Sequence, residues 1–362
     1  MSSTRKPVVV YGASGYTGRL VREYLREYGV PFVAAGRSAD KLHAAMKANV
    51  PGIETADYEV VEVQHGTEAL TELFRGASVV LNTVGPFANF GPEVVQACLA
   101  AGCHYTDTTG EQDWLITLDQ AWGANFEAAG LLLSPGLAQM YTTGEIAAQP
   151  CLETPGLDTL DIAVFWGGSP TIASTQTILV NAATSKAFHL QQNRYVEWQP
   201  DAGLYSLAIP GQHEMALALP WGGTWHPVWF RKDPRVANVK VLGGVFNKPL
   251  MLGVPKIVEA ALKATEGMNE EDRYAELAQT AASVMNAMPP RVAADRGDAE
   301  ELTERELKIL RLLKAGLGNR ELAQSLCLSE ATVKWHLHNI FAKLGVKNRT
   351  SALARAQEIS LL

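Results

Sequence analysis

Four short helical patterns follow one another in residues 302–362 of this 362-residue chain, and they limit its fold more than any other feature. Helices are predicted to open within residues 302–306, 318–323 and 328–336, and residues 345–350 lead into a fourth. Thr303 and Glu306 form a T-x-x-E capping box at the first start. Asn319 and Ser329 are favourable N-cap residues for the next two helices, and Gly345 suits a helix C-terminus. The segment is therefore predicted to be a small all-α domain.

The third of these helices has two different faces. Its apolar residues recur at intervals of four, three and four, as expected of a face turned toward the core: Val333, Leu337, Ile340 and Leu344. The opposite face carries Ala331, Lys334, Trp335 and His338. A tryptophan on the outer face of a small domain is costly to expose unless it contacts something else. This face is therefore predicted to contact a partner.

Charge is divided unevenly along the chain. Residues 302–362 contain ten Lys and Arg residues and five Glu residues, a net charge of +5. The whole chain carries −7, so the first 301 residues carry −12. A basic terminal domain on an acidic body is the charge distribution expected for contact with nucleic acid phosphates.

With these caps, core positions and basic positions, residues 302–362 resemble the LuxR-type helix-turn-helix of MalT-like bacterial regulators. The resemblance implies binding to double-stranded DNA, with the third helix in the major groove. It implies that Lys334, Trp335 and His338 face base edges. The DNA backbone contacts are assigned to His336, Asn339, Lys343 and Arg349. The alternative is a helical protein-interaction domain with a solvated basic face, which the charge distribution disfavours.

The N-terminus has the pattern of a dinucleotide site. A buried-strand pattern at residues 7–11 runs directly into the glycine-rich turn, and an amphipathic helix follows it with Leu20, Val21, Tyr24, Leu25 and Tyr28. Gly12 permits the tight turn, Gly15 lets the backbone approach the pyrophosphate, and Gly18 lets helix and strand pack closely. The predicted cofactor residues of this turn are Gly12, Ala13, Ser14, Gly15, Tyr16, Thr17 and Gly18.

The next strand, residues 31–35, predicts which dinucleotide binds. An NAD site usually has Asp or Glu at the end of this strand, where it binds the ribose hydroxyls. Arg37 occupies that neighbourhood here, and a 2′-phosphate is its natural partner. We therefore expect NADP(H), the alternative being a solvated arginine at a strand end.

A later strand, residues 79–84, should end at the same edge of the sheet and adds cofactor residues Asn82, Thr83, Val84 and Gly85. A helix is predicted from Glu93 to Ala101. Residues 7–150 resemble the saccharopine dehydrogenase-like reductases, which include trans-acting enoyl reductases. The resemblance is carried by residues 12–18, 36–37, 82–87 and 105–111. The resemblance implies a Rossmann domain, a nicotinamide cofactor, a small-molecule substrate or ligand and a homodimer.

The expected fold class is therefore α/β: a Rossmann-type doubly wound parallel sheet, an α+β insert domain, and the all-α helix-turn-helix domain. The expected boundaries are 1–150, 151–288 for the substrate and dimerisation region, 289–301 for a linker and 302–362. Within the insert, residues 157–166 and 236–246 are predicted strands, and 174–192 and 272–288 are predicted helices. Residues 221–227 form a Gly/Trp loop suited to lining a pocket. Reductases of this type commonly continue past the point corresponding to Met288.

The cysteine content and the lack of long apolar runs predict the cellular compartment of the protein. Four cysteines without C-x-x-C spacing are typical of a reducing compartment rather than a disulfide framework. We find no signal peptide and no apolar run long enough to span a membrane, so a bacterial cytoplasmic protein, bound to the nucleoid when on DNA, is expected. No His, Cys or carboxylate cluster has metal-ligand spacing.

No residue can be assigned a catalytic role from the sequence. Candidates near the expected crevice are His104, Tyr105, Asp107, Glu111, Tyr141 and His226. None of them belongs to a motif with a fixed mechanism. Three functions remain open: a transcription regulator that senses NADP(H) or a metabolite, an NADP-dependent reductase with an added DNA-binding domain, and a body that serves only as a dimerisation scaffold.

Overall fold

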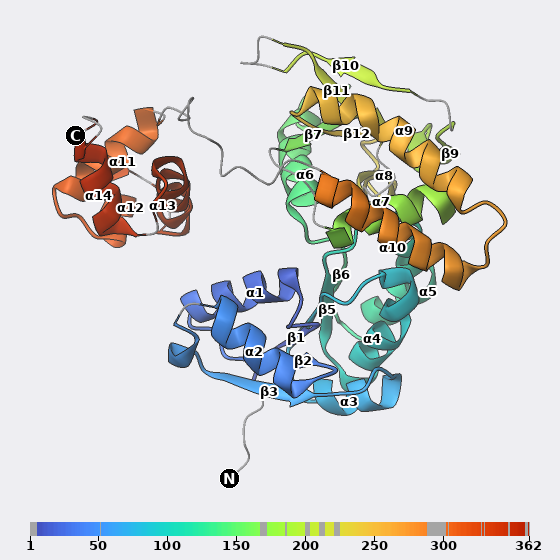
Figure 1. Cartoon of the computed structure of the whole chain (residues 1–362), viewed down its shortest axis with the longest axis horizontal. Helices are drawn as coiled ribbons and strands as arrows, with labels where there is room; N and C mark the ends of the chain where they lie inside the picture. The colour runs from blue at the N-terminus through green and yellow to red at the C-terminus, as the bar shows by residue number, and fades with distance from the viewer. Residues whose placement is uncertain are drawn as a thin grey trace. The chain divides into compact units, whose positions relative to one another are not determined.

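The computed structural model describes residues 6–50, 52–166, 172–184, 187–199, 203–209, 214–220, 225–287, 302, 304–326, 328, 330–346, 348–358 and 361. The chain divides into two compact units, residues 1–288 and 289–362 (Figure 1). The predicted linker, residues 289–301, lies outside the described residues. No helix in the described part of the chain has the length and apolar character that crossing a membrane requires.

The first unit begins with a six-stranded parallel sheet in the order β3-β2-β1-β4-β5-β6. Its strands are β1 (Val8–Tyr11), β2 (Phe32–Gly36), β3 (Tyr58–Glu62), β4 (Val79–Asn82), β5 (His104–Asp107) and β6 (Leu133–Ser134). Its helices are α1 (Tyr16–Glu27), α2 (Ala39–Asn49), α3 (Thr67–Phe74), α4 (Phe87–Ala101) and α5 (Gln112–Ala128), with a short 3-10 helix at Ile53–Thr55. This strand order is that of the doubly wound Rossmann fold.

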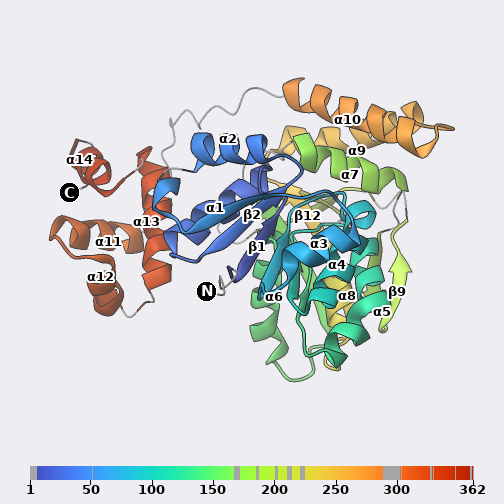
Figure 2. The same ribbon diagram turned by 90° about the horizontal axis from the view of Figure 1, so that it is seen from below.

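Both faces of this sheet are covered by helices (Figure 2). Val10 and Phe32 pack with residues of α1 and α2, whereas Val9 and Val33 pack with residues of α3, α4 and α5. Strands buried on both faces are apolar at successive positions instead of alternating with polar ones, which explains the runs at residues 8–11 and 32–35. The predicted fold class of this domain is confirmed.

The rest of the first unit is built on a mixed sheet in the order β10-β11-β12-β8-β9, with β7 paired in parallel to β12. Its strands are β7 (Thr159–Trp166), β8 (Phe188–Gln191), β9 (Arg194–Glu197), β10 (Tyr205–Leu207), β11 (Ala216–Pro220) and β12 (Asn238–Val245). Its helices are α6 (Gln139–Leu152), α7 (Ile172–Thr184), α8 (His226–Phe230), α9 (Lys248–Ala264) and α10 (Glu270–Ala287). Leu160, Leu190 and Val239 pack one face of the sheet against α6 and Phe230.

Two predicted helices have different bounds in the structure. The helix predicted over residues 174–192 ends at Thr184, and β8 and β9 then form a hairpin. Gln192 and Asn193 make its two-residue turn with positive φ angles of 49° and 58°, a turn that overrides the helical pattern. Helix α4 begins at Phe87, six residues before the predicted start, and continues through Pro92. Both strands predicted in the insert and its second predicted helix agree with β7, β12 and α10 within two residues.

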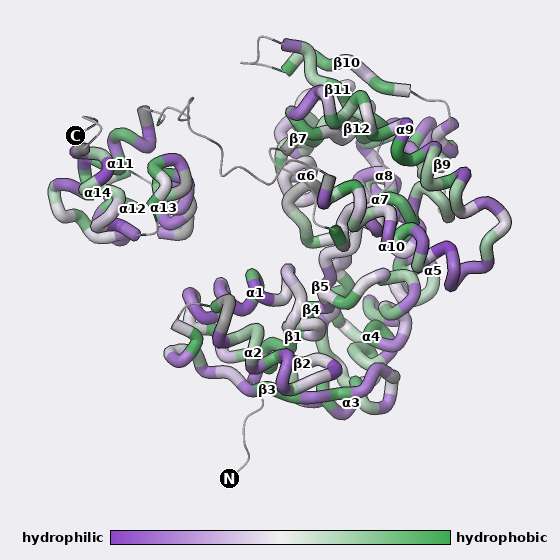
Figure 3. The backbone as a smooth tube through the Cα atoms, in the orientation of Figure 1, coloured by the Kyte–Doolittle hydropathy of each residue, from purple (hydrophilic) through white to green (hydrophobic). Residues whose placement is uncertain are grey.

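The second unit contains α11 (Glu304–Lys314), α12 (Asn319–Leu326), α13 (Glu330–Leu344) and α14 (Arg349–Glu358). Hydrophilic and hydrophobic residues interleave along these helices (Figure 3). The predicted core face of α13 is confirmed, because Val333, Leu337, Ile340 and Leu344 are all buried.

The ends of these helices match the predictions only in part. Gly345 has φ 72°, and the Val346 N–H donates to the Phe341 carbonyl, as in a Schellman C-cap. The predicted N-cap of α12 is wrong by one residue. Asn319 is already helical, while the carbonyl of Gly318 accepts the first helical bond and its N–H donates to Glu321. The predicted cap residues Thr303 and Ser329 lie outside the described residues.

A largely buried ion pair joins the first and third helices of the second unit. Lys343 Nζ lies 2.8 Å from Glu306 Oε2, and the two side chains are 17% and 5% exposed. Removing one partner of such a pair leaves the other charge desolvated without compensation.

Replacing Glu306 with Gln should therefore destabilise the second unit by about 1.5–3 kcal/mol, the range for a hydrogen bond to a charged group. Hydrogen exchange of α11 and α13 amides in the full chain would measure the change. The control is Glu330→Gln, since Glu330 is exposed and its replacement should change stability by roughly 0.5 kcal/mol or less. Equal protection in the two variants would contradict this role of the ion pair.

Candidate functional site

The glycine-rich turn between β1 and α1 is held by backbone contacts. Gly12 has φ 87°, and its N–H and that of Ala13 both donate to the Ala35 carbonyl of the neighbouring strand. A Cβ at Gly12 would lie 2.7 Å from Thr83 Oγ1 and equally close to Val84. Only glycine fits this position, because both the φ angle and the space exclude a side chain.

The N-terminus of α1 is open to an anion. Gly15 is its N-cap, no side chain accepts a hydrogen bond there, and the first turn contains no acidic residue. A Cβ at Gly18 would lie 2.6 Å from the Gly12 carbonyl and 2.7 Å from Ala13 Cα. The helix therefore begins directly against the turn, with the positive end of its dipole at the carboxyl edge of the sheet.

The end of β4 completes this edge. Thr83 Oγ1 donates to the carbonyl of Tyr11 at 2.9 Å, and Asn82 Oδ1 accepts from the Val84 N–H at 3.0 Å. Asn82 is fully buried, while Val84 packs toward Gly12. These predicted cofactor residues therefore shape the backbone of the edge, and Gly85 follows them in the same loop.

Arg37 lies where β2 ends, as the sequence predicted, and its side chain is exposed. The N-terminus of α2 beside it is already capped. The Ala39 N–H donates to Glu62 Oε2 at 2.8 Å, and Ser38 Oγ accepts from the Lys41 N–H. Glu62 is thus engaged as a cap, and Arg37 supplies positive charge at this strand end.

Sequence reasoning missed one set of side chains at the same edge. His65 Nδ1 lies 2.9 Å from the Tyr11 hydroxyl, and His65 Nε2 lies 3.3 Å from Glu93 Oε2. Burial raises the pKa of Tyr11, while the Arg37 charge lowers it. The three residues come from β1, the loop after β3 and α4, so no sequence spacing indicates their meeting.

Asp107 is the centre of a buried hydrogen-bond network. It accepts from the Tyr105 hydroxyl at 2.6 Å, Trp114 Nε1 at 3.2 Å, the Thr109 N–H at 3.0 Å and the Gly136 N–H at 2.8 Å. Burial raises the pKa of its carboxyl, and these hydrogen bonds lower it by less. Asp107 therefore ties the end of β5 to helix α5 and to the loop at Gly136.

Glu111 has a similar structural role. Its two carboxylate oxygens accept from the N–H groups of Phe87 and Ala88, each at 2.8 Å. These are the first two residues of α4, so Glu111 caps that helix from another part of the chain. Burial raises its pKa.

The remaining chemical candidates also bond inside the fold. His226 Nε2 lies 3.0 Å from the Tyr141 carbonyl, and burial lowers the pKa of His226 to about 4, so it is neutral near pH 7. Burial raises the pKa of the Tyr141 hydroxyl well above its usual range. His104 Nδ1 accepts from the Leu132 N–H at 2.9 Å. None of these contacts places the group against an open site.

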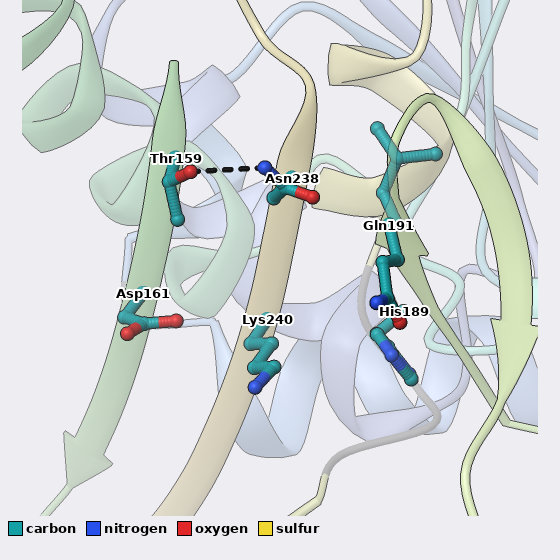
Figure 4. A pocket seen from close by; sticks show the side chains of 7 residues that line it. Thr159, Asp161, His189, Gln191, Asn238 and Lys240 are labelled. Atoms are coloured by element: carbon teal, nitrogen blue, oxygen red, sulfur yellow. Dashed lines mark hydrogen bonds between the residues drawn. The ribbon is translucent and has the colours of Figure 1, made fainter. Parts of the chain in front are cut away.

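A shallow hollow of about 240 Å³ lies on the face of the second sheet that α6 does not cover (Figure 4). Its lining is mostly polar: Thr159, Asp161, His189, Leu190, Gln191, Asn238 and Lys240. Of the Gly/Trp loop predicted to line a pocket, residues 221–224 lie outside the described residues. His226, near the end of that loop, is fully buried.

The predicted base-reading residues belong to α13. Lys334 is half-buried and His338 is exposed, while the side chain of Trp335 lies outside the described residues. Among the predicted backbone contacts, Lys343 pairs with Glu306, and Arg349 donates to the Leu317 carbonyl at 2.6 Å.

His336 and Asn339 are half-buried on the same helix. Burial lowers the pKa of His336. The structure thus places all four backbone candidates partly within the helical unit.

Comparison with known protein families finds a matching family for each end of the chain. Residues 8–129 match the model described as Saccharopine dehydrogenase NADP binding domain, and residues 300–356 match Bacterial regulatory proteins, luxR family. The chain joins these two domains. Both sequence resemblances are thereby confirmed, and the first domain is of a type that binds a nicotinamide dinucleotide. Residues 142–297, between them, match a family of unknown function, DUF5938.

Curated relatives match the nucleotide-binding part. Human Saccharopine dehydrogenase-like oxidoreductase is 33% identical over 130 residues, 32% of this chain and 30% of that protein. Lipid droplet localized protein from Caenorhabditis elegans is 35% identical over 135 residues, 35% of this chain and 32% of that protein. Trans-acting enoyl reductase from Mycobacterium tuberculosis is 36% identical over 107 residues, 29% and 25% of the two chains. The match spans a third or less of each relative.

Among solved structures, apo saccharopine dehydrogenase (L-Glu forming) from Saccharomyces cerevisiae has a TM-score of 0.47 and 14% sequence identity, covering 98% of this chain and 77% of that chain.

The tight contact at Gly18 gives a direct test of the dinucleotide site. Gly18→Ala should push α1 away from the turn, because its new methyl group would overlap two backbone atoms. We expect NADPH binding to weaken about tenfold or more, equivalent to about 1.4 kcal/mol. Calorimetric titration measures this, with Gly253→Ala as the control because a Cβ there meets nothing within 4 Å. Unchanged affinity in Gly18→Ala would place the nucleotide elsewhere.

Proposed function

We propose that this protein is a bacterial transcription regulator whose saccharopine dehydrogenase-like body binds NADP(H), or a metabolite beside it, and transmits that state to its DNA-binding domain. The observation that carries the proposal is that a single chain contains both a dinucleotide turn at an open helix N-terminus and a LuxR-type domain. A ligand-binding body joined to a terminal DNA-binding domain is an arrangement suited to a sensor. The protein acts in the cytoplasm, bound to the nucleoid when it is on DNA.

NADP(H) is the proposed ligand, in preference to NAD(H). Arg37 provides a cation at the strand end where the 2′-phosphate of NADP(H) would lie. Glu62, the nearby carboxylate, accepts a hydrogen bond from the Ala39 N–H at the start of α2 with its Oε2 atom. Gly12–Gly18 would hold the pyrophosphate, and residues 82–85 would border the nicotinamide end.

The hydrogen bonding of the sequence-predicted acid and base candidates favours sensing over turnover, although Tyr11, His65 and Glu93 at the cofactor edge would supply a proton donor to a reductase. The carboxylate oxygens of Asp107 and Glu111 accept hydrogen bonds from donors inside the fold, and His226 is neutral and buried. A reductase needs a proton donor facing its substrate unless water supplies the proton. The alternative function is an NADP-dependent oxidoreductase with an added DNA-binding domain, favoured by the description of the matched nucleotide-binding family.

DNA recognition is proposed for the outer face of α13, with Lys334, Trp335 and His338 at base edges. The DNA backbone would be contacted by His336, Asn339, Lys343 and Arg349. A homodimer would read two half-sites about one helical turn apart, since each LuxR-type domain reads one.

Lys334→Ala should weaken binding to a duplex selected by the full chain from a random pool by about 1–3 kcal/mol, the value of one base-reading side chain. Fluorescence anisotropy measures the affinity, with Lys308→Ala as the control because Lys308 is an exposed lysine on α11. Wild-type affinity in the double variant Lys334→Ala, Trp335→Ala would remove this assignment.

The sensor proposal predicts that NADPH or NADP⁺ changes DNA affinity. A coupling free energy of about 1–3 kcal/mol corresponds to a shift of roughly 5- to 150-fold. The same samples should be assayed for NADPH oxidation, so that sensing and turnover are measured together. Arg37→Asp should lose both NADPH binding and the shift, because its carboxylate repels the 2′-phosphate. Identical DNA affinity without nucleotide, with NADP⁺ and with NADPH would rule out nucleotide sensing.

A further inference from the structure

Helix α1 presents a row of large apolar side chains to solvent. Tyr16, Leu20, Tyr24 and Tyr28 are 53%, 41%, 53% and 55% exposed, and they recur every four residues. Four-residue spacing places them along one side of the helix, over a length of about 18 Å. The opposite side of α1 is buried through Gly18 and Arg22 against the Rossmann sheet. We call the four residues the α1 row.

Such a row is unusual on a surface helix. Single exposed apolar residues are common, whereas a continuous apolar strip rimmed by charges marks a surface that contacts a partner. One border of the row is charged, because Arg19, Glu23 and Glu27 follow one another one turn apart. Arg19 also lies over the Tyr16 ring, with its guanidinium carbon 5.6 Å from the ring centre.

We propose that the α1 row is the contact between two copies of this chain, with α1 packed antiparallel against α1 of the partner across a two-fold axis. The inference rests on the proposed function, which requires a dimer on DNA. The row is self-complementary in this arrangement. With the axis level with Arg22, Tyr16 meets Tyr28 of the partner subunit and Leu20 meets Tyr24 of the partner subunit, as an isologous contact requires.

Charge complementarity selects a second copy, and it selects the antiparallel orientation. On the border of the row, Arg19 lies within two residues' rise, about 3 Å, of both Glu23 and Glu27 of the partner subunit. The two-fold axis repeats these pairs, so four opposite-charge pairs outweigh the one like-charge pair, Glu23 with Glu23 of the partner subunit, next to the axis. A parallel pairing would instead put the two charged borders on opposite sides of the contact, so these charges would meet no partner of opposite sign.

The same helix then links the dimer to the nucleotide. The N-terminus of α1 is the open anion site, and Tyr16 belongs both to the glycine-rich turn and to the α1 row. A dinucleotide that repositions the start of α1 therefore acts on the dimer contact directly, which gives the proposed coupling a physical route.

Sedimentation velocity of the full chain at micromolar concentration tests the contact. Wild type should be a dimer, and Leu20→Glu should raise the dimer dissociation constant at least tenfold by placing a charge at the centre of the row. Leu132→Glu is the control, because Leu132 is also exposed (57%) and lies outside the row. It should remain dimeric.

A charge exchange on the border keeps the test independent of folding. Arg19→Glu should weaken the dimer, and the triple variant Arg19→Glu, Glu23→Arg, Glu27→Arg should restore it, since the same pairs are reformed with reversed signs. A monomeric wild type would overturn both this contact and the dimer of the proposed function. A wild-type dimer that Leu20→Glu and Arg19→Glu leave intact would overturn the α1 contact alone and place the dimer on another surface.

Discussion

The contact between Gly18 of α1 and the backbone of Gly12 and Ala13 is the constraint on which the nucleotide-binding body depends. A single added carbon would lie 2.6 Å from the Gly12 carbonyl, so α1 can approach the strand only with glycine at this position. Because the helix begins against the turn, its N-terminal N–H groups meet the carboxyl edge of the sheet, where the proposed pyrophosphate would lie. The Thr83 hydroxyl then bonds the end of β4 to the carbonyls of Tyr11 and Gly12, which ties this strand end to the same turn.

Buried carboxylates in the body hold this edge together through hydrogen bonds to several segments. Asp107 joins strand, loop and helix through four donors, and Glu111 caps α4, whose start borders the cofactor edge. Groups held in this way are preorganised, and their loss would loosen the crevice. In the proposed sensor, such an edge would hold a dinucleotide in one defined geometry, which would let the protein report its occupancy.

The sequence indicated the parts whose physical cause is local. The apolar run before the glycines predicted a strand buried on both faces, and the four-three-four spacing in α13 predicted its core. The sequence did not indicate which distant segments contact one another. Glu111 allows α4 to start before Pro92, and no spacing between these residues signals the cap. In α1 the apolar residues cover more than one side of the helix, so periodicity alone did not show that Leu20 faces solvent while Val21 packs inward. The turn at Gln192 and Asn193 was likewise not predicted, because the residues around it have a helical pattern.

Thermodynamic reciprocity gives the most direct test of a regulator whose nucleotide and DNA sites are coupled. The measurement is the NADPH dissociation constant of the full chain, by calorimetry, without DNA and with a saturating selected duplex. If the sites are coupled, the constant changes by the same factor, roughly 5- to 150-fold, by which NADPH changes DNA affinity. An NADPH dissociation constant that is the same with and without bound DNA would contradict the account and leave two domains that act independently on one chain.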